Sequence, residues 1–133
     1  MAAGDLKSDD CVVITGVISA ATTKGEVMVK TQGVTTWAPA TDGSKGKFGV
    51  ALEAGPLGSE TIRICIWGPV EVGSTAVAIP KGVYVIPTGA GLVAEGLTQS
   101  ILETTIIDTI CGVAMTAGAA AGGAGMVIWV GMM

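Results

Sequence analysis

The sequence predicts an all-β protein, a compact β-barrel-like or sandwich domain built from two related halves. Half of the 133 residues are hydrophobic but only 4% are aromatic, so the apolar side chains are mainly Val, Ile and Ala, which favour strands. The 21 glycines supply tight turns. A strand-like block also occurs twice, and such repetition constrains the architecture. A chain of this length can bury one shared core, whereas separate domains of about 60 residues would each be marginal.

Three blocks of the chain are repeated, and each reads as one or two short strands. The pairs are FGVALEAG at 48–55 with CGVAMTAG at 111–118, IRICIWG at 62–68 with MVIWVG at 126–131, and KGEVMV at 24–29 with KGVYVI at 81–86. The halves therefore cover about 24–68 and 81–131 of a single domain over 11–133. In this match Trp67 and Trp129 end equivalent strands and are expected to pack in the core or at the end of a barrel.

In the first half, a polar arm at 1–10 precedes the predicted strands. A glycine at 16 indicates a break or bulge in the first strand, and the third is expected to end before Pro39. Residues 50–53 and 61–67 form a hairpin across the loop at 55–60, in which side-chain alternation places Ile62, Ile64 and Ile66 on the core face. The predicted strands are 11–18, 25–30, 34–37, 50–53 and 61–67, with a turn at 40–47.

In the second half, Gly73, Pro80 and Pro87 punctuate three further predicted strands, at 69–72, 75–79 and 83–86. Residues 97–109 combine helical spacing of apolar residues with a β-branched run, so a loop plus strand is expected there, with a short helix as the alternative. A closing hairpin follows. Apolar residues occupy both faces of its last strand, so we expect the half that ends in Trp129 to be buried deepest, in the barrel or between subunits.

The closing segment 109–133 carries no charge and is long enough to cross a bilayer as a helix. Its counterpart in the first half contains Glu53, Glu60 and Arg63, which fit poorly in lipid. The centre of the segment is also rich in glycine, which costs about 1 kcal/mol per residue in a helix. The repeat therefore favours a hairpin over a membrane helix, and the acidic start of the chain does not match a signal peptide.

Composition argues against several classes of function. The net charge is −4 with Arg63 as the one arginine, whereas nucleic-acid binding needs a basic surface. The chain has no histidine, which argues against an enzyme without excluding carboxylate or lysine chemistry, and no metal or cofactor site is expected. Cysteines 11, 65 and 111 form no CxxC pair and are interpreted as small buried hydrophobes.

Few residues stand out as a site. The run GSKGK at 43–47 resembles a phosphate-binding loop, but Thr41 and Phe48 occupy positions where that motif needs glycine and a hydroxyl residue, so a solvated turn is predicted. Lys24 and Lys81, each followed by glycine, are turn signals. Trp37, in a polar context beside Pro39, is the tryptophan expected to be exposed as an interface anchor.

The order of these motifs resembles a small capsid-decoration family of tailed phages and related archaeal viruses. The resemblance covers nearly the whole chain. The motifs that carry it are KGEV at 24–27, GVALEA at 49–54, TIRICIWG at 61–68, PKGVYVI at 80–86 and GVAM at 112–115. The uncharged closing segment and residues 97–109 depart from the pattern.

The resemblance implies a β-barrel-like homotrimer that cements neighbouring major capsid proteins on the outer face of an assembled shell. Such a protein is made in the host cytoplasm and resides in the virion, with no catalytic residue, cofactor, nucleic acid or membrane. A membrane-associated or secreted β protein anchored by the closing segment is the alternative, and a cofactor-free carboxylate enzyme is a third. The candidates for capsid or subunit contact are Asp9, Asp10, Trp37, Asp42, Lys45, Lys47 and Trp129.

Overall fold

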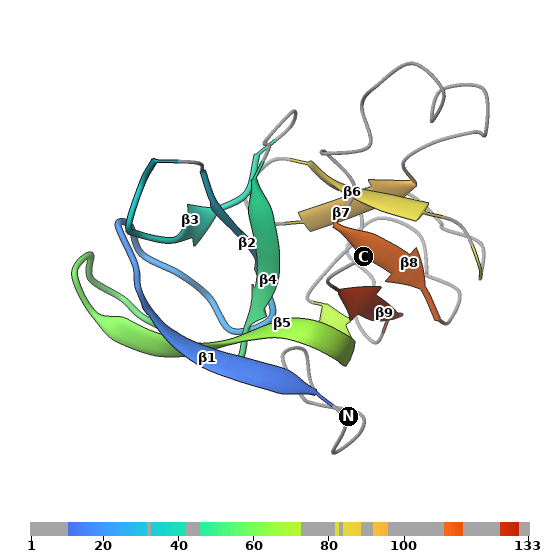
Figure 1. Cartoon of the computed structure of the whole chain (residues 1–133), viewed down its shortest axis with the longest axis horizontal. Helices are drawn as coiled ribbons and strands as arrows, with labels where there is room; N and C mark the ends of the chain where they lie inside the picture. The colour runs from blue at the N-terminus through green and yellow to red at the C-terminus, as the bar shows by residue number, and fades with distance from the viewer. Residues whose placement is uncertain are drawn as a thin grey trace.

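A computed structural model describes residues 11–31, 33–41, 46–72, 82, 84–88, 92–95, 111–115 and 126–130. Every regular element in these residues is a β-strand, which confirms the all-β prediction. The strands form a curled antiparallel sheet in the order β3-β2-β4-β5-β9-β8-β6-β7, a half-barrel, with β1 paired to β5 beside this path (Figure 1). Their bounds are β1 Val12–Val17, β2 Val27–Lys30, β3 Ala38–Pro39, β4 Lys47–Ala51, β5 Thr61–Val72, β6 Tyr84–Thr88, β7 Leu92–Glu95, β8 Gly112–Ala114 and β9 Met126–Val130.

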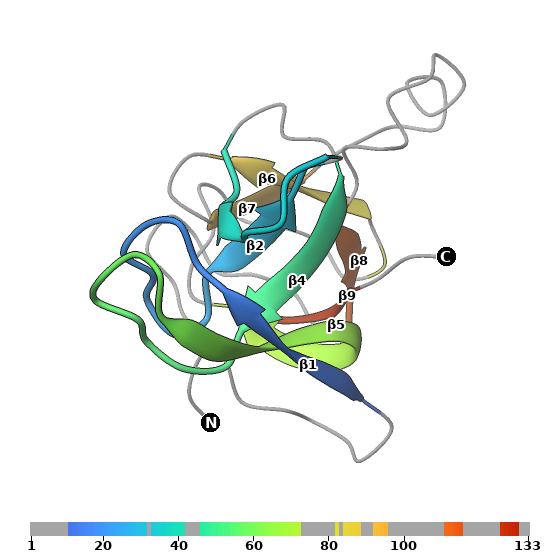
Figure 2. The ribbon, with the colours of Figure 1, turned by 60° about the vertical axis from the view of Figure 1, so that its left-hand side comes forward.

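The longest strand, β5, belongs to both halves of the sheet (Figure 2). Up to Trp67 it pairs with β1, and it also pairs with β4; from Gly68 to Val72 it pairs with β9. Gly68 has a φ of 114°, which side-chain-bearing residues rarely adopt, and a Cβ atom there would lie 2.9 Å from Cys11 Sγ. The two strands predicted at 61–67 and 69–72 are therefore one continuous strand.

The pairing order repeats along the chain. In the first half β2 pairs with β3 and β4, and β4 pairs with β5; in the second half β6 pairs with β7 and β8, and β8 pairs with β9. Both predicted hairpins, β4–β5 and β8–β9, are present. Val27 pairs with Val50, and Tyr84 pairs with Val113, so the two halves also share a register.

The register corrects the expected equivalence of the two tryptophans. Val50 lies opposite Cys65 and Val113 lies opposite Trp129, so Trp129 occupies the position of Cys65 and not of Trp67. A close approach of the strands beside the repeated glycines accompanies this register. A Cβ atom on Gly49 would lie 3.0 Å from the carbonyl oxygen of Cys65, and a Cβ atom on Gly112 would overlap that of Trp129. Matching tryptophan to tryptophan in the sequence shifted the second strand by two residues.

The central strand has buried residues on both faces and not on the isoleucine face alone, since Cys65 is buried while Arg63 and Trp67 on its face are exposed. Ile62 and Ile64 pack with Ile18, Met28 and Trp37 in one cluster. Cys65 lies in a second, larger cluster that also contains core residues of the second half, namely Val70, Val72, Val85, Ala114, Ile128 and Val130. β5 is therefore a strand with apolar neighbours on two sides, as expected for the middle of a closed or strongly curled sheet.

Several predicted bounds differ from the structure. The third strand is Ala38–Pro39, at the sheet edge where proline is tolerated, instead of 34–37. The irregularity in β1 lies between Val12 and Val13 and not at Gly16. Pro87 lies within β6, and β7 was not predicted. The predictions for 1–10, 75–79 and 97–109 lie outside the described residues.

The described parts of the uncharged closing segment are the strands β8 and β9, each paired in the sheet, as the hairpin prediction required. Within the described residues, none of the chain forms a helix with the length and apolarity needed to cross a membrane.

Candidate binding surfaces

Trp37, predicted to be an exposed contact, is buried with 3% of its surface exposed, so the expectation of exposure is wrong. Its backbone N–H donates to the carbonyl of Val17, and its carbonyl accepts from the N–H of Ser19. Its ring lies against β1, where a Cβ atom on Gly16 would be 2.5 Å from the indole. Gly16 is thus required by close packing, and Trp37 fills the smaller core cluster.

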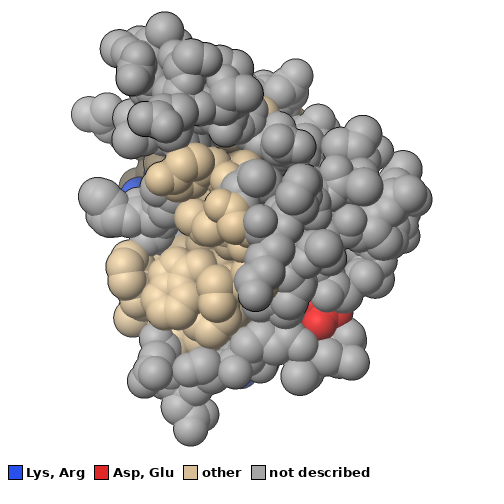
Figure 3. All heavy atoms as spheres, turned by 90° about the vertical axis from the view of Figure 1, so that its right-hand side faces the viewer, with Lys and Arg blue, Asp and Glu red and all other residues tan. Residues whose placement is uncertain are grey.

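An aromatic row crosses the second half of the sheet. Tyr84 pairs with Val113, and Val113 pairs with Trp129, so the three side chains share one face, and all are half-buried. Trp67, 41% exposed, meets the ring of Trp129 edge to face with centroids 5.7 Å apart. The face in Figure 3 carries a continuous uncharged area of described residues. We use "aromatic row" for Tyr84, Val113, Trp129 and Trp67; such exposed apolar surfaces typically serve association.

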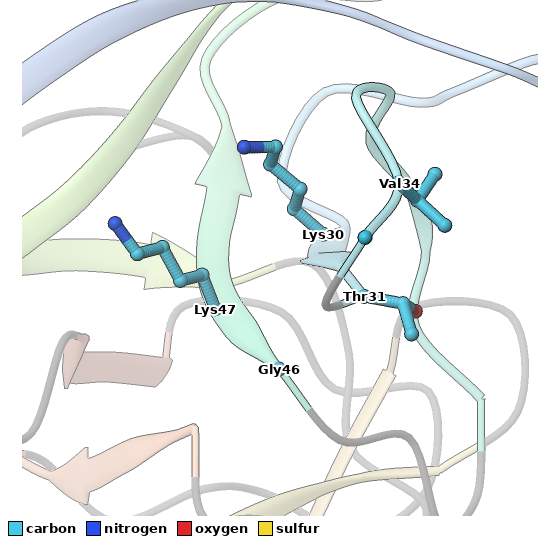
Figure 4. A pocket seen from close by; sticks show the side chains of 6 residues that line it. Lys30, Thr31, Val34, Gly46 and Lys47 are labelled. Carbon is cyan, nitrogen blue, oxygen red and sulfur yellow. The ribbon is translucent and has the colours of Figure 1, made fainter.

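A hollow of about 250 Å³ lies at the end of β2 and the start of β4. Lys30 and Lys47 are directly opposite each other in the β2–β4 ladder, and their side chains extend in the same direction (Figure 4). Lys47 is exposed and Lys30 is half-buried. The lining, called the lysine hollow below, is Lys30, Thr31, Gly33, Val34, Gly46 and Lys47.

The described carboxylates mostly hold local backbone. Glu53 Oε2 accepts from the backbone N–H of Arg63 at 2.7 Å and pairs with the Arg63 guanidinium at 3.4 Å. Glu60 accepts from the N–H of Leu57, and Glu26 from that of Thr23. These carboxylates therefore stabilise turns and the hairpin.

The cysteines behave as packing residues. Burial raises the pKa of Cys65 to about 11, and this exceeds the opposing effect of a backbone hydrogen bond from Trp67. Burial likewise raises the pKa of Cys111 to about 12. Both thiols are neutral at physiological pH and buried, which confirms the interpretation of these two as hydrophobes; Cys11 is half-buried, and all three are free.

Two of the residues predicted to contact the capsid or another subunit lie on the surfaces described above. Lys47 lies in the lysine hollow and Trp129 in the aromatic row. Asp9, Asp10, Asp42 and Lys45 lie outside the described residues.

Sequence reasoning missed Lys30 and Tyr84 as surface residues, and it missed Glu71, a carboxylate with 2% exposure opposite Val127. The repeat aligns Tyr84 with Val27, so a comparison of the two halves could have identified Tyr84 as a residue that differs between them. The position of Lys30 opposite Lys47 depends on strand register.

The similarity of this chain to known proteins is a similarity of fold. No protein-family model matches the chain, and no curated protein matches it in sequence. Among solved structures, it is similar to the crystal structure of the N base of head fiber gp8.5 in bacteriophage phi29. The TM-score is 0.62 at 14% sequence identity, over 90% of this chain and 93% of that chain. The likeness covers nearly all of both chains and agrees with the barrel-like fold.

Proposed function

We propose that this chain is a structural virion protein that binds the outer surface of an assembled capsid and stabilises it. The observation that supports this function is the fold likeness to the base of a phage head fiber, over 90% of this chain and 93% of the other. The sequence motifs that resemble the capsid-decoration family point to the same class of protein by a separate route. The proposed partner is the major capsid protein, and the proposal assigns the chain no catalytic step, cofactor, nucleic acid or membrane.

Stabilisation of a shell requires preference for the assembled state. A protein that binds the assembled lattice and not free subunits shifts the equilibrium toward the lattice by mass action. Contacts repeated by a multimer raise retention well above the affinity of one site. A small, rigid sheet domain that exposes separate binding surfaces is suited to this role.

We propose a homotrimer as the bound form, with the aromatic row as the contact between copies. Tyr84 and Trp129 combine a large apolar area with few rotatable bonds, and aromatic side chains contribute much of the energy of protein interfaces. In sedimentation velocity, the expected species has three times the 13.1 kDa mass of the chain. Tyr84→Ser with Trp67→Ser should shift it to monomer. Leu57→Ser, which removes a hydrophobe exposed by 68%, is the control and should leave it unchanged.

The deciding test of function is co-sedimentation with assembled capsids and, in parallel, with unassembled capsid protein. The chain should pellet with shells, saturate at a fixed ratio, and raise the temperature at which the shells rupture. It should not bind the unassembled subunit. Equal binding to both forms, or to neither, would refute a stabilising role on the shell.

A further inference from the structure

We propose that the lysine hollow binds a carboxylate side chain from an acidic protein segment. This inference deepens the proposed function and rests on it for the partner, an acidic segment on the outer surface of the shell protein. The hollow would then be the contact that fixes the chain on its partner, while the aromatic row joins copies of the chain.

The placement of the two lysines carries the argument. Lys30 and Lys47 are cross-strand neighbours on one face of the sheet (Figure 4). Like charges directly opposite each other destabilise a ladder. An anion between the two ammonium groups would remove this repulsion. Because ammonium groups donate and never accept hydrogen bonds, they are complementary to carboxylate oxygens.

The fold does not require lysine at this point. The register of the two halves places Pro87 of β6 at the position of Lys30, so the equivalent strand carries an uncharged residue there. Within the described residues, no carboxylate forms an ion pair with Lys30 or Lys47, whereas Arg63 is paired with Glu53. Two of the seven basic residues of a chain with net charge −4 are therefore held together at one hollow.

The size and backbone of the hollow favour a side chain as its ligand. Its volume of about 250 Å³ is below the range of about 300–1,000 Å³ typical of small-molecule sites. The backbone at Gly46 packs closely against that of Lys30, since a Cβ atom on Gly46 would lie 2.5 Å from the carbonyl oxygen of Lys30.

The overall charge favours a protein carboxylate over a nucleic acid. A polyanion would extend well beyond two lysines and meet the negative surface of a chain with net charge −4. A single carboxylate interacts with the lysine pair alone, since screening confines charge effects to about 8 Å at physiological salt.

The direct test is an amide NMR titration of the whole chain with a terminally blocked peptide that carries one glutamate among serine and glycine residues and, separately, with a hexathymidine oligonucleotide. The peptide should shift the amides of Lys30, Thr31, Gly33, Gly46 and Lys47, and binding should weaken as salt is raised. Lys30→Gln with Lys47→Gln should weaken peptide binding about tenfold. Lys24→Gln with Lys81→Gln, which changes the net charge equally, should not. Unchanged binding by the first variant, shifts elsewhere, or a preference for the oligonucleotide would overturn the proposal.

Co-sedimentation with assembled capsids separates this inference from the proposed function. If the wild-type chain pellets with shells and the Lys30→Gln, Lys47→Gln variant pellets equally well, the function stands and the hollow is not the contact. If the wild-type chain does not pellet, the proposed function fails, and the peptide titration still decides whether the hollow takes a carboxylate. Thermal melts of both double variants check that each is folded.

Discussion

The two halves of this sheet share connectivity but differ in what covers them. Equivalent residues Ile64 and Ile128 are both fully buried. On the opposite face, Cys65 of the first half is buried in the larger cluster, whereas its equivalent Trp129 is half-buried. At this position the first half is thus covered on both faces and the second half on one. A repeated backbone can therefore carry a core on one copy and a binding surface on the other.

The largest expected effect compares two equivalent buried positions in different core clusters, Ile64 in the smaller cluster and Ile128 in the larger one. Ile64→Ala and Ile128→Ala should each lower the free energy of unfolding by about 2–5 kcal/mol, since each leaves a cavity among fully buried neighbours. Urea unfolding measures both. A loss below about 1 kcal/mol for one variant only would show that its half relaxes around the cavity and that the halves are not equivalent.

One buried thiol in each half predicts a loss of stability at alkaline pH. The folded pKa values of Cys65 and Cys111 lie above the ordinary value of 9.0, so the stabilisation is complete below about pH 9 and declines as pH rises toward 11 to 12. Each thiol steepens the decline by up to about 1.4 kcal/mol per pH unit.

Urea midpoints between pH 8 and pH 10.5 measure this decline. The Cys65→Ala, Cys111→Ala variant should be less stable at pH 8 but should show a shallower decline. If the urea midpoints of the variant and the wild type declined equally with pH, the two thiols would not be the cause of the decline.

The repeated glycines should respond unequally. A methyl group at Gly112 meets the backbone of Trp129, which cannot move aside, while the nearest atom to one at Gly49 is a methyl of Ile64. We expect Gly112→Ala to cost about 1–3 kcal/mol and Gly49→Ala less. Thermal unfolding compares them, with Gly33→Ala as a control for backbone strain without crowding. A larger loss of stability for Gly49→Ala than for Gly112→Ala would contradict this expectation.

The seam between the halves is joined by one tryptophan from each. The edge-to-face contact of Trp67 with Trp129 should contribute a coupling energy of about 0.5–1.5 kcal/mol. A double-mutant cycle with Trp67→Leu and Trp129→Leu measures it. Because the aromatic row also serves the proposed trimer, every member of the cycle carries Tyr84→Ser and is measured at a concentration where sedimentation velocity shows a monomer. A coupling near zero would mean that the rings are adjacent without energetic consequence.

The smallest expected effect concerns the lysine hollow of the first half. Lys30→Glu replaces a like-charged cross-strand pair by an opposite pair and should raise the free energy of unfolding by about 0.2–1 kcal/mol. The same change should abolish binding of the single-glutamate peptide. A gain in stability with a loss of binding would identify the repulsion as a feature retained for recognition. A loss of stability would show that the two ammonium groups do not repel each other in the folded chain.

Local pattern predicted what depends on local sequence. β-branched runs and turn glycines located most strands, and the repeat identified both hairpins, because each hairpin is formed by residues close in the chain. Trp37 shows the limit. Its neighbours in sequence are polar, but β1 and β5 supply the residues that bury it, and no local signal reports them.

Strand register was the second property that the sequence did not predict. The tryptophans were aligned by identity, whereas the structure aligns the strands through Gly49 and Gly112 and their close approach to the next strand. The two cross-strand lysines follow from the same register. Surface pairs of this kind become visible only when strand partners are known, because the side-chain face changes with every one-residue shift.

The continuity of β5 gives the molecule a mechanical property. Its backbone runs through peptide bonds from the pairing with β1 into the pairing with β9, so a tensile load on one half reaches the other covalently. To part the halves, a force must shear whole ladders of hydrogen bonds along β5 instead of peeling apart a side-chain interface. Cutting the chain at Gly68 would remove this tether, while each fragment would keep its own segment of β5 and the pairing that the segment makes.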